Sequence, residues 1–308
     1  MGRWLRLVIA LRLALVLGLL WAPWVLSAPV SLWRVQQGPS TLFLLGSIHV
    51  GQPNLYPLPA VMDQAFIAAD QLVLEIDLGL TSPTAMAEAL LSRGTYPATE
   101  NLSANLSVDT LRLLTAYLQA RRAQPQQTDL SLPTVQRLRP WYLAMLLNLE
   151  ALKALGYVPG LGIDQYYFQK ASLAGKPVYG LETLESQIAL LAAGSPSQQD
   201  LILRSTLETN QKIAQLLATL TGAWKAGEID LMYKLAIADH ADYPALGDLM
   251  DEYLDQRNLQ MAAKLRTYLD GDKTTLAVVG ALHLGGEQGL LALLAKDYEI
   301  TQLQSSDL

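Results

Sequence analysis

The sequence predicts an α/β fold with a mainly parallel central sheet, built from two βαβ-containing halves that carry large helical inserts. Two similar segments support this prediction: Thr41 to Gly51 reads TLFLLGSIHVG, and Thr275 to Gly286 reads TLAVVGALHLGG. Their near-continuous apolar runs are typical of parallel strands that helices cover on both faces. Stretches with helical spacing separate further apolar runs, as expected when crossover helices join parallel strands.

The first 28 residues have the pattern of a secretory signal peptide. Three arginines precede an apolar run from Leu13 to Leu26, which ends in the small residues Ser27 and Ala28. We therefore expect export to the periplasm or the extracellular space. Cleavage near this point and retention of the segment as a membrane tether are both open. The absence of cysteine excludes a lipoprotein.

The remaining chain, residues 29–308, is long enough for one large α/β domain. The full chain has 28 acidic and 22 basic side chains, and three of the basic ones lie in the N-terminal segment. So acidic a chain is an unsuitable partner for nucleic acid. Without cysteine, thiol nucleophiles, disulfides and cysteine-based metal sites are excluded. Any metal must be held by histidine, carboxylates, amides or backbone oxygen.

The first half of the predicted sheet has two strands joined by a helix. A strand at Leu42–Leu45 leads to a helix opened by Pro57 and Pro59, and a second strand follows at Leu72–Leu74. Glu75 ends this second apolar run. A carboxylate in such surroundings is costly to bury unless it is paired or ligated, although acids at strand ends also serve as simple caps.

Two long stretches are predicted to be helical inserts that roof the site. Residues 81–160 and 196–270 carry leucine, alanine and methionine at helical spacing and show no convincing strand pattern. We expect both stretches to be almost wholly helical.

The second half of the predicted sheet begins near Gly160. A helix and a turn lead to a strand at Val178–Leu181, which ends at Glu182. Asp164 could cap this helix or reach the site, and capping is the simpler interpretation. The final motif supplies a strand at Ala277–Val279, and a closing helix and one more strand end the chain.

Two of the three histidines follow a glycine by three residues in the repeated motifs. His49 and His283 would lie just beyond the carboxyl ends of their strands, where ligands bind in open α/β sheets. If the two strands are neighbours, their imidazoles could face each other. A single GxxH is more simply a satisfied loop histidine, but the repetition favours function. His240 lacks this context and is predicted to be an ordinary surface or core residue.

These groups form a sufficient ligand set for a catalytic divalent ion such as Mn²⁺, Co²⁺ or Zn²⁺. Two imidazoles, from His49 and His283, and one or two carboxylates, from Glu75 and Glu182, leave a position open for water. A carboxylate that is not a ligand could carry protons. Arg257 could bind a substrate carboxylate or a developing oxyanion.

Several alternatives remain open at the level of sequence. Ser47 could offer a hydroxyl to substrate, although a turn hydrogen bond is its simpler role. Without metal, a histidine could act as general base in an esterase. The same side chains would also suit a non-enzymatic protein that binds haem, iron or a peptide. HExxH, GxSxG and P-loop signatures are absent.

The motifs resemble those of the TraB/PrgY/GumN family, to which the animal Tiki metalloproteases are related. The resemblance uses GSIH, the acid in LVLEIDL, the GxD and GKPVYGLET blocks, the Arg-Asn pair in YLDQRN and VVGALHLGG. It spans residues 32 to 303 and is nearest to the bacterial GumN-like branch.

The resemblance implies a fold shared with erythromycin esterases and ChaN haem-iron proteins. For the Tiki branch it implies a metal-dependent peptidase, so a peptide or small molecule is the expected substrate. It implies that His49, Glu75, Glu182 and His283 form the site. Arg257 and Asn258 would lie beside it, and Asn258 would bind substrate.

Overall fold

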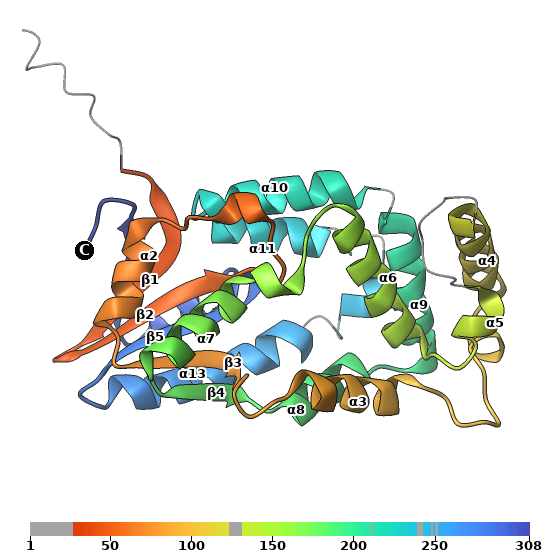
Figure 1. The fold of residues 1–308 in the computed structure, drawn as a ribbon, viewed down its shortest axis with the longest axis horizontal. Coiled ribbons are helices and arrows are strands. Elements are labelled where there is room, and N and C mark those ends of the chain that lie inside the picture. The colour runs from red at the N-terminus through yellow and green to blue at the C-terminus, as the bar shows by residue number, and fades with distance from the viewer. Residues whose placement is uncertain (1–26, 123–130, 211, 239–242, 248, 250–251) are drawn as a thin grey trace, which may run out of the picture.

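The computed structural model describes residues 27–122, 131–210, 212–238, 243–247, 249 and 252–308. A sheet occupies one end of the molecule, and a group of helices occupies the other (Figure 1). Nearly all of the predicted signal peptide lies outside the described residues, as does His240. Within the described ranges, no helix is both long enough and apolar enough to cross a membrane.

One mixed sheet of six strands forms the centre of the fold. Its order is β4-β3-β5-β2-β1-β6. Strand β1 is antiparallel to both of its neighbours, whereas the pairs β2–β5, β5–β3 and β3–β4 are parallel. The strands are β1 (Pro29–Gln37), β2 (Ser40–Ser47), β3 (Gln71–Ile76), β4 (Val178–Glu182), β5 (Thr274–Gly280) and β6 (Glu299–Gln304).

The four predicted strands that carry the motifs are confirmed as neighbours in one sheet. The two repeated segments form β2 and β5, which pair directly, with Ser47 opposite Gly280. Strand β1 was not predicted. It follows the apolar leader and pairs with β2 through a turn at Gly38, where φ is 53°. That turn uses the backbone freedom of glycine.

Helices pack on the sheet and extend beyond it. Helix α7 packs on β3 and β5, whereas α13 packs on β2 and β4. The α-helices of the described ranges are α2 (Ala60–Ala68), α3 (Pro83–Gly94), α4 (Val108–Arg122), α5 (Leu132–Val135), α6 (Pro140–Ala154), α7 (Ile163–Ala174), α8 (Leu184–Leu191), α9 (Pro196–Thr209), α10 (Ile213–Lys225), α11 (Ile229–Ala238), α13 (Arg257–Leu269) and α14 (Leu290–Leu294).

The buried apolar side chains form two cores. The larger one surrounds the sheet and includes residues of β2, β3, β5, α7 and α13. The smaller one lies between α4, α6 and α9 and includes Leu114, Leu147 and Leu203. The helices at the far end of Figure 1 therefore have apolar packing of their own. Helix α13 belongs to the larger core, although its sequence lies within the predicted second insert.

The parallel strands present their carboxyl ends along one edge of the sheet. Following the strand order, Glu182, Glu75, Gly280 and Ser47 stand in a row at the ends of β4, β3, β5 and β2. Residues at the carboxyl ends of parallel strands meet at one edge by geometry alone. This edge carries the candidate site.

Candidate active site

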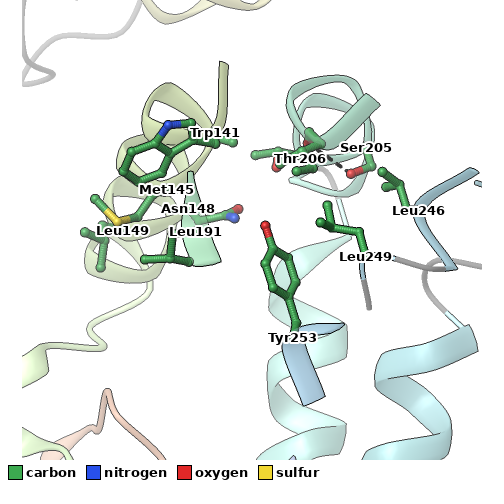
Figure 2. Close-up of a pocket in the computed structure, with 12 residues that line it drawn as sticks. Trp141, Met145, Asn148, Leu149, Leu191, Ser205, Thr206, Leu246, Leu249 and Tyr253 are labelled. Atoms are coloured by element: carbon green, nitrogen blue, oxygen red, sulfur yellow. Dashed lines mark hydrogen bonds between the residues drawn. The ribbon is translucent and has the colours of Figure 1, made fainter. Parts of the chain in front are cut away.

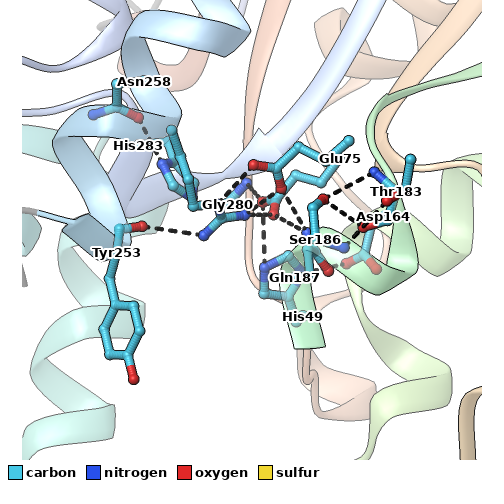
Figure 3. A network of polar contacts seen from close by, with 12 residues as sticks. His49, Glu75, Asp164, Thr183, Ser186, Gln187, Tyr253, Asn258, Gly280 and His283 are labelled. Atoms are coloured by element: carbon cyan, nitrogen blue, oxygen red, sulfur yellow. Dashed lines mark hydrogen bonds and ion pairs between the residues drawn. The ribbon is translucent and has the colours of Figure 1, made fainter. Parts of the chain in front are cut away.

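His49 and His283 both lie near Gly280, beyond the ends of the paired strands β2 and β5 (Figure 3). His49 follows β2 by two residues, whereas His283 ends a short 3-10 helix that follows β5. Glu75 of β3 completes the group, and its Oε1 lies 3.5 Å from His49 Nε2. Of the four residues expected to converge, the structure brings His49, Glu75 and His283 to this edge, while Glu182 lies beside them at the end of β4.

The three side chains border one small space above the Cα atom of Gly280. A methyl group on Gly280 would lie 2.9 Å from Glu75 Oε1, 3.1 Å from His49 Nε2 and 3.6 Å from His283 Cδ2. The backbone at Gly280 is ordinary, with φ of −50°. Glycine is therefore required here because a side chain would not fit, and not because the backbone conformation demands it. Any side chain at this position would displace the groups that meet there.

His283 is buried and held by an amide. Its Nδ1 lies 2.6 Å from Asn258 Oδ1, and the Asn258 amide nitrogen donates to the carbonyl of Gln288 at 2.9 Å. Because that amide group is used as a donor, Asn258 Oδ1 must accept from His283 Nδ1–H. This tautomer leaves a lone pair on Nε2. Burial lowers the pKa of His283 to about 4, so the ring is neutral at pH 7.

His49 is open to solvent and held by a carboxylate. Its side chain is 58% exposed, and its Nδ1 lies 3.3 Å from Asp164 Oδ1. Desolvation lowers its pKa, but the hydrogen bond that Nδ1–H donates to Asp164 and the charge of Glu75 outweigh this and raise the pKa to about 9. Because water reaches the ring, these ion pairs are screened and stabilise the fold less than buried pairs would.

For Asp164 the favoured sequence-based interpretation, helix capping, was wrong. Gly162, not Asp164, caps α7, and Asp164 turns to His49 and accepts a hydrogen bond from Ser47 Oγ at 2.9 Å. A Cβ on Gly162 would lie 2.4 Å from the carbonyl oxygen of His49. The glycine lets the two segments approach, and the aspartate two residues later then reaches the imidazole. The GxD spacing was the signal that could have identified Asp164.

Arg257 joins the two carboxylates of β3 and β4. Its Nη2 donates to Glu75 Oε2 and to Glu182 Oε2, both at 2.8 Å, and its Nε donates to Glu182 Oε1 at 2.8 Å. Gln187 of α8, which the sequence analysis missed, donates to both carboxylates at 3.0 Å. Both oxygens of Glu182 are thus engaged, which leaves it poorly suited to bind a metal.

Glu75 keeps one oxygen directed at the space above Gly280. The backbone N–H of Gly280 donates to Glu75 Oε1 at 2.7 Å. Burial alone would raise the pKa of Glu75, but the charges of His49 and Arg257 and this hydrogen bond hold it at about 2. The carboxylate is therefore ionised at neutral pH.

Three further predicted roles do not match the contacts in the structure. Asn258 is fully buried, so it orients His283 and does not reach a substrate. Ser47 is also buried and donates to Asp164. Arg257 has a third contact, because its Nη1 donates to the carbonyl of Tyr253 at 3.2 Å. Of its five N–H groups only one on Nη1 is left, so it cannot hold a substrate carboxylate with a free fork.

The paired histidines open onto a cavity of about 340 Å³. A second cavity, of about 330 Å³, lies between α6 and α9, and the hydroxyl end of Tyr253 points into it (Figure 2). The lining of this second cavity includes no histidine and no carboxylate. Of these two cavities, the first is therefore the one with candidate catalytic and metal-ligating side chains in its lining.

The ligand set is not already arranged as a metal site. Within the described ranges, no group of three or more histidine, aspartate and glutamate side chains has a geometry that could hold an ion as it stands. In addition, Arg257 occupies one oxygen of Glu75 and both of Glu182.

Comparison with known proteins gives a family match that includes both GxxH motifs. The model of the TraB/PrgY/gumN family matches residues 31–302. An uncharacterized protein from Escherichia coli strain K12, YbaP, is 32% identical over 256 residues, which cover 82% of this chain and 86% of that protein. Its counterpart in Shigella flexneri gives the same values. No solved structure matches. The chain, with both GxxH motifs inside the matched region, belongs to the TraB/PrgY/gumN family.

Proposed function

We propose that this chain is a divalent-metal-dependent hydrolase that cleaves a peptide bond. The observation that carries the proposal is the convergence of His49 Nε2, Glu75 Oε1 and the His283 ring on the space above Gly280. Three nitrogen and oxygen donors with an open fourth position are the pattern of catalytic metal sites. The proposal extends to the fold, for which we infer the arrangement of erythromycin esterases and ChaN proteins.

The donor chemistry of these residues fits a divalent ion. Each histidine engages its Nδ1 with an oxygen, from Asp164 or from Asn258, which leaves Nε2 as the nitrogen available to an ion. Such partners fix the tautomer and the ring orientation of metal-ligating histidines. The ion would supply Lewis-acid activation of water and of the scissile carbonyl. We assign His49, His283 and Glu75 as its ligands, and Mn²⁺, Co²⁺ and Zn²⁺ as candidates.

In this proposal Glu182 and Arg257 act beside the ion. Glu182 fixes the guanidinium of Arg257 through two hydrogen bonds. The remaining N–H on Nη1 would donate to the oxyanion that develops on the carbonyl oxygen. Glu182 is therefore a positioning residue, and Arg257 is the residue expected to touch the substrate.

Reconstitution with metal tests the proposal. Chelated protein is loaded with Mn²⁺, Co²⁺ or Zn²⁺ and assayed against a quenched peptide library, with His49→Ala and His283→Ala as controls. Metal-dependent cleavage that both controls lack is the expected result. The absence of cleavage with every metal, together with a Soret band on haem titration, would instead favour the binding-protein alternative.

Glu75→Gln separates two roles for this carboxylate. Glutamine keeps the shape of the side chain but is a poor ligand and a poor base. Loss of both metal binding and turnover is expected if Glu75 is a ligand, as we propose. Retained metal with lost turnover would reassign Glu75 as the general base.

We also propose that the protein acts outside the cytoplasm, in the periplasm or the extracellular space. The arginine-flanked apolar segment of residues 1–28 supports this. Fractionation of cells, followed by N-terminal sequencing of the protein, distinguishes cleavage near residue 28 from retention as a membrane tether. Recovery of the full-length protein in the cytoplasm would contradict export.

A further inference from the structure

The cavity beside the two histidines is lined by polar and by apolar side chains. The polar ones include His49, His283 and Arg257. The rest of its wall is mostly apolar, with major contributions from Ile48, Val50, Leu217, Leu220, Met232 and Leu254. No carboxylate and no lysine belongs to the lining. The volume, about 340 Å³, falls at the lower end of the range of about 300–1,000 Å³ typical of small-molecule sites.

Helix α10 supplies a wall that is apolar but only half-buried. Ile213, Leu217, Leu220 and Trp224 follow one another at intervals of three and four residues and so share one face of the helix. Trp224 is buried, whereas the three aliphatic residues are only partly covered by the protein. An apolar stripe that the fold itself does not cover is available to an apolar ligand.

This wall is fixed relative to the histidines. The indole N–H of Trp224 donates to the carbonyl of Gly46 at 2.7 Å, three residues before His49. On the other side, the hydroxyls of Tyr157 and Thr221 lie 3.3 Å apart. The leucines of α10 therefore face the site from a helix that is attached to β2, the strand that delivers His49.

We propose that the apolar wall of this cavity forms a specificity pocket for the substrate. The pocket would take a large uncharged side chain, such as leucine, methionine or phenylalanine, next to the cleaved bond. The proposal rests on the proposed hydrolase function and names its substrate class. Burying such a side chain favours binding by at least about tenfold relative to leaving it exposed. A charged side chain would instead lose its hydration against a wall that offers no partner.

Peptide cleavage tests the pocket through its preference. In a quenched series that differs at one position, leucine is expected to give kcat/KM at least about tenfold above lysine or aspartate. Leu220→Asp should lower kcat/KM for the leucine peptide by about tenfold or more and favour the lysine peptide, with metal affinity unchanged. Leu173→Asp is the matched control, because Leu173 is 91% exposed on α7 and does not line the cavity. Cleavage with no preference at any position would overturn the pocket while leaving the hydrolase intact.

A binding measurement keeps the pocket testable without turnover. The uncharged apolar dye N-phenyl-1-naphthylamine is titrated into metal-free protein and followed by fluorescence. We expect saturable binding that Leu220→Asp weakens about tenfold or more and that Leu173→Asp leaves unchanged. This result in a protein that cleaves no peptide would support the pocket and reject the hydrolase. Equal binding by wild type and Leu220→Asp would reject the pocket itself.

Discussion

The two GxxH motifs share a strand, a glycine and a histidine, yet the structure gives their histidines opposite environments. His283 is 4% exposed, is held by the neutral amide of Asn258, and has a pKa lowered to about 4. His49 has a side chain that is 58% exposed, is held by the carboxylate of Asp164, and has a pKa raised to about 9. The motif therefore sets the position of each histidine in the chain fold. The charge of each imidazole depends instead on its hydrogen-bond partner and its burial.

This difference suggests a division of labour within the proposed site. The neutral, buried His283 is ready to donate its Nε2 lone pair at pH 7. The protonated His49 must release a proton before it can bind an ion, because metal ligands are deprotonated.

Alanine at either histidine should abolish metal binding and turnover, but only one substitution should affect folding. His283→Ala leaves a cavity and an unpaired buried Asn258 oxygen, so we expect a loss of about 1–3 kcal/mol in the free energy of unfolding. His49→Ala removes an exposed ring and should change stability by about 0.5 kcal/mol or less. Urea unfolding of both chelated variants measures the difference. Equal losses in the free energy of unfolding would show that the different burial of the two histidines does not affect stability.

Removal of the partner groups should weaken metal binding without removing a ligand. Asn258→Ala and Asp164→Ala are each expected to reduce metal affinity by about 10–100-fold, because each frees an imidazole to rotate or to change tautomer. Calorimetric titration measures the affinities. Leu173→Ala, on an exposed face of α7, is the control. Unchanged affinity in Asn258→Ala would argue against His283 as a ligand.

Metal binding should release about one proton at pH 7, and that proton should come from His49. The reason is that His49, with its pKa of about 9, is protonated before binding, whereas His283 is already neutral. Titration in buffers with different ionisation enthalpies counts the protons. Asp164→Asn removes the charge that helps to raise the pKa of His49, so this variant should release fewer protons. If Asp164→Asn releases as many protons as the wild type, the released proton comes from a group other than His49.

The metal-free protein should be most stable near pH 6.5, because the two histidines pull its stability in opposite directions. His49 binds its proton more tightly when folded, so its stabilising effect is complete below about pH 6.5 and is lost as pH rises through about 9. His283 is neutral when folded, so stability falls as pH drops from about 6.5 toward 4. Glu75, with a pKa of about 2, adds a further loss below about pH 4.5.

Thermal unfolding in chelator across this pH range measures the profile. His49→Gln should flatten the alkaline limb, and His283→Gln should flatten the acidic limb between pH 6.5 and 4. The alkaline effect should be the smaller one, since solvent screens the exposed His49. An alkaline limb that persists in His49→Gln would assign it to another group.

The pattern of amino acids alone identified the strands that carry the site and the edge at which they end. Apolar runs ending in glycine or glutamate indicated β2, β3 and β5, because parallel strands buried on both faces need continuous apolar residues. The short run before Glu182 indicated β4, although this edge strand is only partly buried. It also placed His49, Glu75 and His283 at that edge. Strand β1 escaped prediction because it directly follows an apolar leader, which masks the start of a new element.

Only the tertiary structure decided which groups face the imidazoles and how these are charged. Asp164, Gln187 and Asn258 reach the site from α7, α8 and α13, which are far apart in the sequence and converge through packing on the sheet. Local signals favoured helix capping for Asp164, since a side chain at the start of a helix is usually used there. A pKa depends on burial and on neighbouring charges, and both are properties of the folded chain.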